Sequence, residues 1–145
     1  MGALTLSDIL VTSLPKIVTP GGNVLHAMKQ GDLGYAGFGE AYFSWVSFGS
    51  VKAWKRHTQM TMNLIVPVGQ VRFVFRLDNT SGAEEFRVEE IGEEWYARIT
   101  VPPGIWFGFQ GLKAPQSLVL NIANIDHNPN EVERLDLVKV NYVWS

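Results

Sequence analysis

Apolar and polar positions alternate in several short segments of the chain, and the clearest of these covers residues 70–78. Four apolar side chains from Val71 to Leu77 share one face, and most of the other face is polar or charged. A repeat of two residues is typical of a β-strand with one buried face. The preceding segment, 61–68, is rich in apolar and β-branched residues and predicts a second strand, separated from the first by Gly69.

Similar short segments continue along the chain, with turn-forming residues between them. We expect further strands at residues 41–46, 51–57, 86–91, 95–101, 105–112, 117–125 and 135–144, and a short helix or strand at residues 7–14. Short strands separated by turns at intervals of about ten residues indicate a sandwich or barrel. The pattern therefore predicts one all-β domain over residues 1–145, a small closed barrel with little helix whose function lies in its interior.

Composition narrows the function classes. The chain has 145 residues, of which 46% are hydrophobic and 18% are charged, which suits a single globular domain. The net charge of −2 argues against nucleic acid as a partner, because phosphate binding needs a surplus of basic residues. The absence of cysteine excludes disulfides and thiolate zinc sites. Neither a signal peptide nor a long apolar segment is recognisable, so we expect a cytoplasmic protein with no membrane partner.

Residues 51–57 form an unusually cationic segment. Strict alternation would place Lys55 and His57 on one face of the strand, and Lys52 and Arg56 on the other, with a tryptophan between them. One interpretation is an exposed edge strand, where lysines deter aggregation. The other is a site for an anion or a sugar phosphate, in which cations lie beside an aromatic ring.

Two further segments could carry chemistry. Residues 101–109 join a rigid Pro-Pro-Gly turn to a strand crowded with aromatic residues, which could pack in the core or let Trp106 stack on a base or sugar. A strand end is followed by Asp126 and His127. A histidine there is most often a surface residue, but convergence of His57 and His127 could support acid–base chemistry or metal binding.

In this order, these segments resemble the dTDP-4-dehydrorhamnose 3,5-epimerase family, which has a cupin-type jelly roll. The similarity runs from about residue 37 to residue 131. Residues 101–109, Val-Pro-Pro-Gly-Ile-Trp-Phe-Gly-Phe, match the family's Ile-Pro-Pro-Gly-Phe-Ala-His-Gly-Phe most specifically. Residues 38–44 lie where the family has Gln-x-Asn-x-Ser, of which Ser44 matches. Residues 51–57 lie where it has Leu-Arg-Gly-Leu-His-x-Gln.

The resemblance implies proton transfer next to the keto group of a nucleotide-linked sugar, without a cofactor or metal. A ketone delocalises the carbanion as an enolate, so a side chain of moderate basicity suffices. The family uses a histidine base and a tyrosine acid. The base position is Lys55 here, and the histidine of the second motif is Phe107. The tyrosine falls near Asp126 or His127, and the family's arginine is Lys52.

Three interpretations of this altered site follow. In the first, Lys55 is the base, because burial and cationic neighbours lower a lysine pKa. The proton would then be returned by Tyr42, Asp126 or His127. In the second, His57 is the base, since it lies two residues along on the same expected face. In the third, the chain binds a nucleotide-activated deoxysugar without catalysis.

A metal-dependent cupin enzyme is a separate class of function. Such sites need two or three histidines and a carboxylate. The chain has three histidines, His26, His57 and His127, and they form no His-x-His pair. The sequence therefore favours the nucleotide-sugar interpretation.

We expect the site to occupy the barrel interior. Its expected floor and walls are Lys55, His57, Asn63, Phe73, Phe107 and Asn121, and the expected mouth is Lys52 and Arg56. Further expected substrate-binding residues are Tyr42, Ser44 and Trp106. Residues 1–36 form an N-terminal arm whose apolar positions, between Leu10 and Val18, suit packing on a homodimer partner or a lid over the chain's own barrel.

Overall fold

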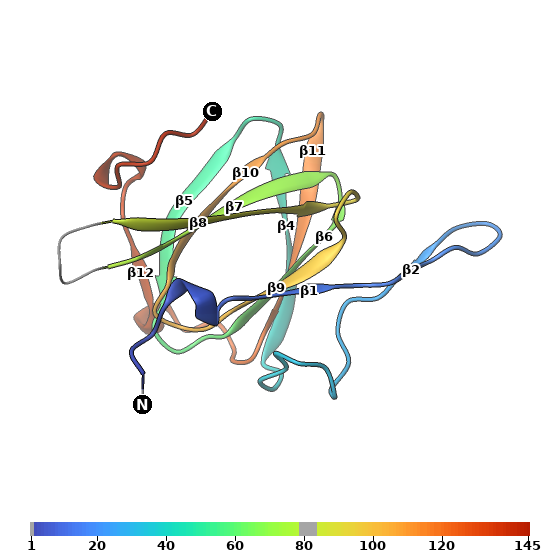
Figure 1. Cartoon of the computed structure of the whole chain (residues 1–145), viewed down its shortest axis with the longest axis horizontal. Coiled ribbons are helices and arrows are strands. Elements are labelled where there is room, and N and C mark those ends of the chain that lie inside the picture. Colours follow the sequence, from blue (N-terminus) through green and yellow to red (C-terminus); the bar gives the residue numbers. More distant parts are fainter. Residues whose placement is uncertain (1, 79–83) are drawn as a thin grey trace.

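Two five-stranded antiparallel sheets face each other in the computed structural model, which describes residues 2–78 and 84–145 (Figure 1). The first sheet has the order β1 (Leu10–Ser13), β9 (Ala97–Val101), β6 (Met62–Val68), β11 (Gln116–Ala123) and β4 (Glu40–Ser47). The second has the order β12 (Val132–Arg134), β5 (Val51–His57), β10 (Trp106–Gly111), β7 (Gln70–Leu77) and β8 (Glu85–Gly92). From β4 to β7 the chain changes sheet at every strand, so residues distant in sequence share one interior.

Eight of the predicted strands are confirmed within two residues at each end, namely β4 to β11. The predicted strand at 135–144 is wrong. The short strand β12 ends at Arg134, before this range, and residues 135–144 contain only η3 (Leu137–Lys139) and are held largely through side-chain packing rather than a strand ladder. The segment 7–14 contains both expected elements, a 3-10 helix, η1 (Leu6–Asp8), and then β1.

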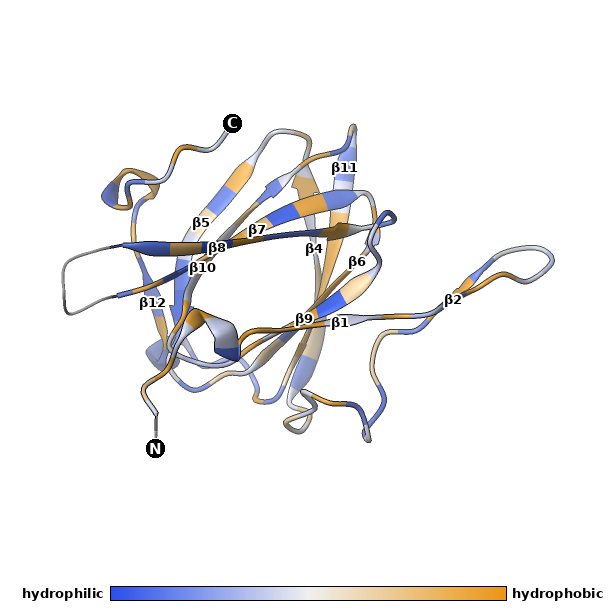
Figure 2. Ribbon diagram, viewed as in Figure 1, coloured by the Kyte–Doolittle hydropathy of each residue, from blue (hydrophilic) through white to orange (hydrophobic). Residues whose placement is uncertain are grey.

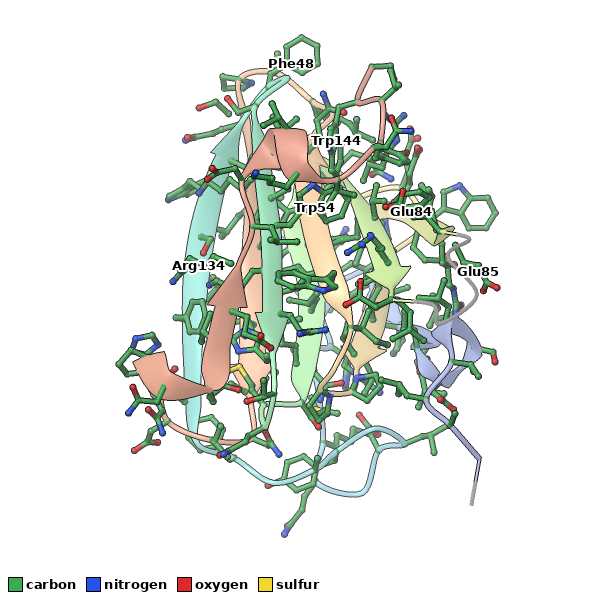
Figure 3. All side chains as sticks on the ribbon, turned by 90° about the vertical axis from the view of Figure 1, so that its left-hand side faces the viewer. Phe48, Trp54, Glu84, Glu85, Arg134 and Trp144 are labelled. Carbon is green, nitrogen blue, oxygen red and sulfur yellow. The ribbon has the colours of Figure 1, made fainter. Side chains whose placement is uncertain are left out.

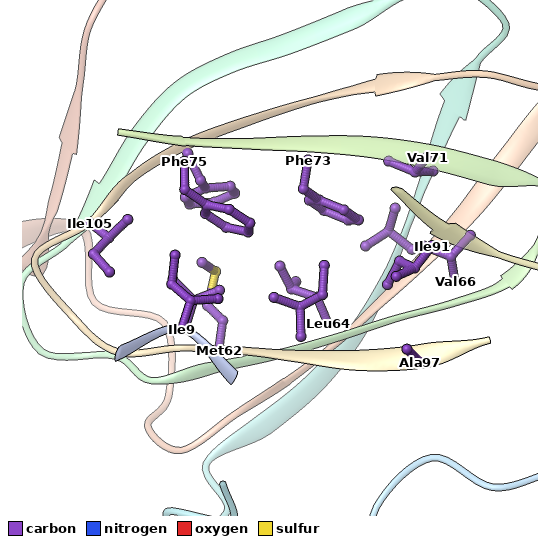
Figure 4. Packing of buried hydrophobic residues seen from close by; sticks show 14 of the residues in the cluster. Ile9, Met62, Leu64, Val66, Val71, Phe73, Phe75, Ile91, Ala97 and Ile105 are labelled. Carbon is purple, nitrogen blue, oxygen red and sulfur yellow. The ribbon is translucent and has the colours of Figure 1, made fainter. Parts of the chain in front are cut away.

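The core lies between the sheets, and Figure 4 shows it from close by. Apolar and polar residues alternate along the strands (Figure 2), so each strand turns one set of apolar side chains inward. Phe73 and Phe75 of β7 are fully buried and lie across from Met62 and Leu64 of β6. This packing fixes the interior faces of both sheets, and so determines which side chains can reach an interior site.

The N-terminal arm divides into two parts. A two-stranded hairpin, β2 (Lys16–Ile17) and β3 (Val24–Leu25), projects away from the body (Figure 1). The loop that follows is tied to the outer face of the first sheet by Arg98, whose guanidinium donates hydrogen bonds to the carbonyl oxygens of Ala27 at 2.8 Å and Leu33 at 3.1 Å. That loop therefore covers part of the sheet opposite to the core.

Helical structure in the described ranges is short. It consists of three 3-10 turns, η1, η2 (Pro129–Glu131) and η3 (Leu137–Lys139). No helix in the part of the chain that the structure describes has the length and apolar character needed to cross a membrane.

Candidate active site

A cavity of about 560 Å³ opens between the sheets, on the side where β4 and β12 are the outermost strands. Its wall from the first sheet includes Tyr42, Ser44 and Asn121, and its wall from the second includes Lys52 and Lys55. The remaining lining residues are Ala53, Trp54, Met62, Leu64, Phe107, Phe109, Val119, Arg134, Leu135, Asp136 and Leu137. The lining is mainly apolar with a few polar groups, as in small-molecule sites generally.

A β-bulge in β5 brings the two lysines to the same cavity. In the pairing of β5 with β10, Phe107 lies opposite Lys55 and Gly108 lies opposite Ala53, so Trp54 is an extra residue. The expectation that Lys52 and Lys55 occupy opposite faces is therefore wrong. Strict alternation fails here because the inserted residue reverses the direction of every side chain that precedes it.

The two lysines have different surroundings. The Lys52 ammonium donates a hydrogen bond to the Trp45 carbonyl at 2.7 Å, across the cavity mouth. Within the described residues, the Lys55 amine has no hydrogen-bond or ion-pair partner and faces the cavity. Burial lowers the pKa of Lys55, the nearby Arg134 guanidinium lowers it further, and the Glu131 carboxylate acts in the opposite direction. Lys55 is thus a lining amine whose charged form is disfavoured by its surroundings.

The opposite wall presents a tyrosine and an amide. Asn121 Nδ2 donates a hydrogen bond to the Tyr42 hydroxyl at 3.1 Å, which fixes the phenol at the cavity edge. Asn121 is 3% exposed, and its Oδ1 has no hydrogen-bond partner within the described part of the chain. A buried acceptor without a partner is costly, so a ligand hydroxyl at this position would be stabilised.

A histidine–carboxylate pair lies buried beside the cavity. His57 Nδ1 is 2.5 Å from Glu131 Oε2, and the other Glu131 oxygen accepts hydrogen bonds from the amides of Gln59 and Met60 at 3.0 Å each. The His57 ring stacks on Phe107 with centroids 6.0 Å apart. Burial lowers the pKa of His57 despite the carboxylate, so its imidazole is neutral at pH 7. Burial acts to raise the pKa of Glu131, but these hydrogen bonds outweigh it and lower that pKa.

The structure places the expected site residues in different environments. Six of them line the cavity: Tyr42, Ser44, Lys52, Lys55, Phe107 and Asn121. His57 and Phe73 are buried in the interior but do not line it.

The other expected residues lie away from the cavity. Asn63 is on the outer face of the first sheet, where it bonds Gly34 and Thr100. Arg56 and Trp106 are on the outer face of the second sheet, with the guanidinium 4.6 Å from the ring centroid. Asp126 and His127 are exposed and do not line the cavity.

Sequence reasoning missed the wall built by residues 134–137. Arg134 is the cross-strand partner of Lys55, and Asp136 is the acidic member of the cavity lining. This wall follows the region that resembles the epimerase family, and its strand is three residues long. A pairing between residues about eighty positions apart leaves no local pattern that could reveal it.

No group of three or more His, Cys, Asp or Glu side chains in the described residues is close enough together to hold a metal ion. His26 is on the N-terminal arm, His57 is paired with Glu131, and His127 is exposed. The three histidines are therefore not assembled into the ligand set of a metal-dependent cupin.

Solved structures with the same architecture are known, although no family model and no curated protein matches the sequence. Among solved structures, the dTDP sugar isomerase of Desulfovibrio desulfuricans G20 is 32% identical, with a TM-score of 0.87, over 94% of this chain and 90% of that chain. A dTDP-4-dehydrorhamnose 3,5-epimerase of Sulfolobus tokodaii is 18% identical, with a TM-score of 0.79, over 97% and 84%. A sugar 3,4-ketoisomerase of Thermoanaerobacterium thermosaccharolyticum, in complex with TDP, is 14% identical, with a TM-score of 0.75, over 90% of each chain.

The sandwich and its interior cavity define a cupin-type jelly roll, which confirms the expected fold class. Within that class, the chain belongs to the family of dTDP-sugar isomerases. It shares its fold with dTDP-4-dehydrorhamnose 3,5-epimerases, and Lys55 stands where the resemblance of residues 37–131 places the base histidine of that family.

The buried pair predicts a pH-dependent stability. Because the folded-state pKa of His57 is below its ordinary value of 6.5, folding stability is full above that pH and falls as the pH drops below it. The lowered pKa of Glu131 acts in the same direction below its ordinary value of 4.5. Urea unfolding should give a lower free energy of unfolding at pH 5.5 than at pH 7.5. In His57→Gln, the difference between the two pH values should be smaller.

Glu131→Gln should lower the free energy of unfolding at pH 7.5 by about 2 kcal/mol, because charged hydrogen bonds to buried partners are lost. Glu133→Gln is the matched control, since Glu133 is an exposed partner of Arg56, and it should cost less than about 1 kcal/mol. Equal stability of the two variants would contradict the assignment.

The charge next to Lys55 predicts a second pH effect. Arg134→Gln removes a cation that lowers the pKa of Lys55, so the titration midpoint of Lys55 should move to higher pH. Titration of ¹³C-methylated lysines by NMR, with Lys55→Arg to assign the resonance, measures it without substrate. Arg87→Gln, at an ion pair with Glu89, is the control. An unchanged midpoint in Arg134→Gln would show that Arg134 does not influence the amine.

Proposed function

We propose that the protein isomerises or epimerises a nucleotide-linked 4-keto-6-deoxy sugar, with Lys55 as the base. The observation that carries this proposal is Lys55 itself. Its pKa is lowered, its amine has no hydrogen-bond or ion-pair partner among the described residues, and it faces the cavity in a fold shared with a dTDP-sugar isomerase. Proton removal next to a ketone needs a base that is partly unprotonated near neutral pH. Burial shifts the pKa of a lysine in that direction, as it does for Lys55.

The charges around the cavity suit an anionic ligand. Lys52, Lys55 and Arg134 line it, against the single lining carboxylate of Asp136. A nucleoside diphosphate carries at least two negative charges, so this surplus of cations attracts it. Lys52 occupies the position of the family's arginine, and its ammonium acts as a point charge rather than a bidentate fork. We infer that the diphosphate lies towards Lys52, and the sugar lies deeper, against Lys55.

The proton would pass between two walls. Lys55 removes the proton from a carbon adjacent to the keto group, and the electron pair moves onto the carbonyl oxygen to give an enolate. Tyr42 then returns a proton from the first sheet, across the cavity from Lys55. Delivery to the opposite face of the carbon inverts it. If the proton is delivered to the former keto carbon instead, the hydroxyl on the deprotonated carbon passes its proton to the enolate oxygen and becomes the new ketone, so the ketone moves without an external oxidant. Asn121 Oδ1 would accept a hydrogen bond from a sugar hydroxyl and so orient the ring.

Lys55→Ala should reduce solvent deuterium incorporation into dTDP-4-keto-6-deoxyglucose at least 100-fold, the usual contribution of a general base. NMR of the sugar protons in D₂O measures the rate. Lys113→Ala, an exposed surface lysine, is the control and should keep the wild-type rate.

Two results would change this proposal. Exchange that survives Lys55→Ala but is lost in a folded His57→Gln protein would transfer the role of base to His57. If dTDP binds tightly in calorimetry while the wild-type protein exchanges no proton of any keto sugar offered, the protein is a binding module without catalysis.

Tyr42→Phe should retain deuterium exchange while slowing product formation.

We also propose that the protein is a homodimer of the cytoplasm, in which the β2–β3 hairpin packs on the partner. The hairpin leaves Ile17, Val18 and Val24 exposed, at 44%, 81% and 50%. Exposed apolar side chains on a projecting element are typical of an interface. In such a dimer, the partner subunit would cover the apolar side chains of the arm, which is one of the two roles expected for it.

Light scattering coupled to size exclusion should give twice the chain mass for the wild-type protein at about 50 µM, a concentration that favours specific dimers. Val18→Glu should shift the population towards the monomer, because it places a charge in the interface. A wild-type protein that remains monomeric at that concentration would refute the dimer.

A further inference from the structure

One wall of the cavity is a single layer of chain at the edge of a sheet. Residues 134–137 all line the cavity, and they begin at the last residue of the edge strand β12. Beyond the β12 pairing, this wall is joined to β5 by two backbone hydrogen bonds, from the Trp54 amide to the Leu135 carbonyl and in reverse, both 3.1 Å. An edge strand of three residues has little stability of its own. The wall therefore depends on whatever holds the chain after it.

The chain after the wall is held by aromatic packing on the other side of the same sheet. It passes through η3, buries Val140 at 3% exposure, and places Tyr142 and Trp144 against Trp54. The ring centroids of Trp54 and Trp144 are 5.5 Å apart, and those of Trp54 and Tyr142 are 6.3 Å apart. Tyr142 also packs on Phe86 of β8, at 5.2 Å. Figure 3 shows this outer face, with Trp54 and Trp144 labelled.

Trp54 connects the two sides of the sheet. It lines the cavity and bonds Leu135 through its backbone, and it belongs to the outer aromatic cluster that receives Tyr142 and Trp144. The wall ends at Leu137 and the buried anchor begins at Val140, so the connection between them is short. A movement of the anchor is therefore passed to the wall rather than absorbed by a long loop.

The anchor is also a weak point. Within the described residues, the indole nitrogens of Trp54 and Trp144 are buried without a hydrogen-bond acceptor. Buried donors without partners offset part of the stabilisation that apolar contact provides. Besides buried Val140 and one hydrogen bond from Arg72 Nη1 to Ser145 Oγ at 3.3 Å, the docked segment is held by the contact area of its aromatic rings, so truncation of one ring should loosen it.

We propose that Tyr142 and Trp144 are positioning residues, which clamp the C-terminal segment to the outer face of the second sheet and so hold the 134–137 wall of the substrate cavity. They do not line the cavity themselves. The clamp sets how tightly the ligand is enclosed, and the groups that transfer protons, Lys55 and Tyr42, lie on other strands. Its kinetic consequence rests on the proposed function.

Trp144→Ala and Tyr142→Ala test the clamp in the full-length protein. We expect the KM for dTDP-4-keto-6-deoxyglucose to rise about 10-fold while kcat, measured at a pH above the titration midpoint of Lys55, changes less than about 2-fold, because Arg134 influences proton transfer only through the pKa of Lys55. The amide of Leu135 should exchange its hydrogen about 10-fold faster, measured by mass spectrometry below the melting temperature. Trp144→Phe should restore both values, and Val143→Ala, which is 85% exposed, is the matched control.

Either of two results would overturn the clamp. One is wild-type protection of Leu135 in Trp144→Ala, which would show that the wall does not depend on the anchor. The other is a fall of kcat in proportion to the folded fraction with KM unchanged, which would show a role in global stability alone. Hydrogen exchange needs no substrate, so it decides the clamp even if the wild-type protein turns over no keto sugar, the result that would instead refute the proposed function.

Discussion

The bulge at Trp54 is the constraint on which the site depends. Trp54 points outward because it is next to Lys55, and the extra residue in β5 opposite β10 then returns Lys52 to the cavity side. Without it, regular alternation would keep Trp54 on the outer face but would direct Lys52 into solvent as well. A single irregularity of the ladder thus places both lysines in the interior, on the strand whose outer face receives the C-terminal segment. Bulges commonly redirect side chains at functional sites in this way.

The cavity combines positive charge with Lys55, which the proposed mechanism requires in its neutral form. Arg134 and burial favour the neutral amine of Lys55, whereas Glu131 favours the charged form. Glu131 is held by His57 and by the amides of Gln59 and Met60, so its charge is compensated close to its own position. This local compensation limits the influence of the carboxylate on Lys55. The buried pair therefore serves the site by fixing the end of β5 while leaving the amine reactive.

Most of the fold could be predicted from the sequence, because the strands from β4 to β11 carry their own alternation and turn residues. The aromatic strand at 101–109 and its Pro-Pro-Gly turn also identified the family. The site was predictable only in part. Asn63 lies on a strand whose neighbours Met62 and Leu64 are both in the core, so alternation alone sends it outward, to Gly34 and Thr100.

Other parts of the site depend on contacts that no local pattern records. The position of Lys52 follows from a bulge that is defined only by the pairing with β10. Arg134 becomes part of the site through its pairing with Lys55. Tyr142 and Trp144 pack against Trp54 on the outer face of the second sheet. The 135–144 segment has the apolar content of a strand. Its aromatic side chains instead pack on the outer face of the second sheet, and this packing holds the segment without the hydrogen bonds of a β-ladder.

Two of the departures from the family's motifs are related to each other in the structure. Lys55 stands where the resemblance places the base histidine, and Phe107 stands where it places a second histidine. In the structure these two residues are direct cross-strand partners on β5 and β10. A histidine titrates near neutral pH without help, whereas a lysine does so only when its charged form is penalised. Phe107 is 7% exposed and offers no polar group to an ammonium, and burial is the leading cause of the lowered pKa of Lys55. An apolar ring in place of the second histidine therefore disfavours the charged form of Lys55, which is the environment that its proposed role as the base requires.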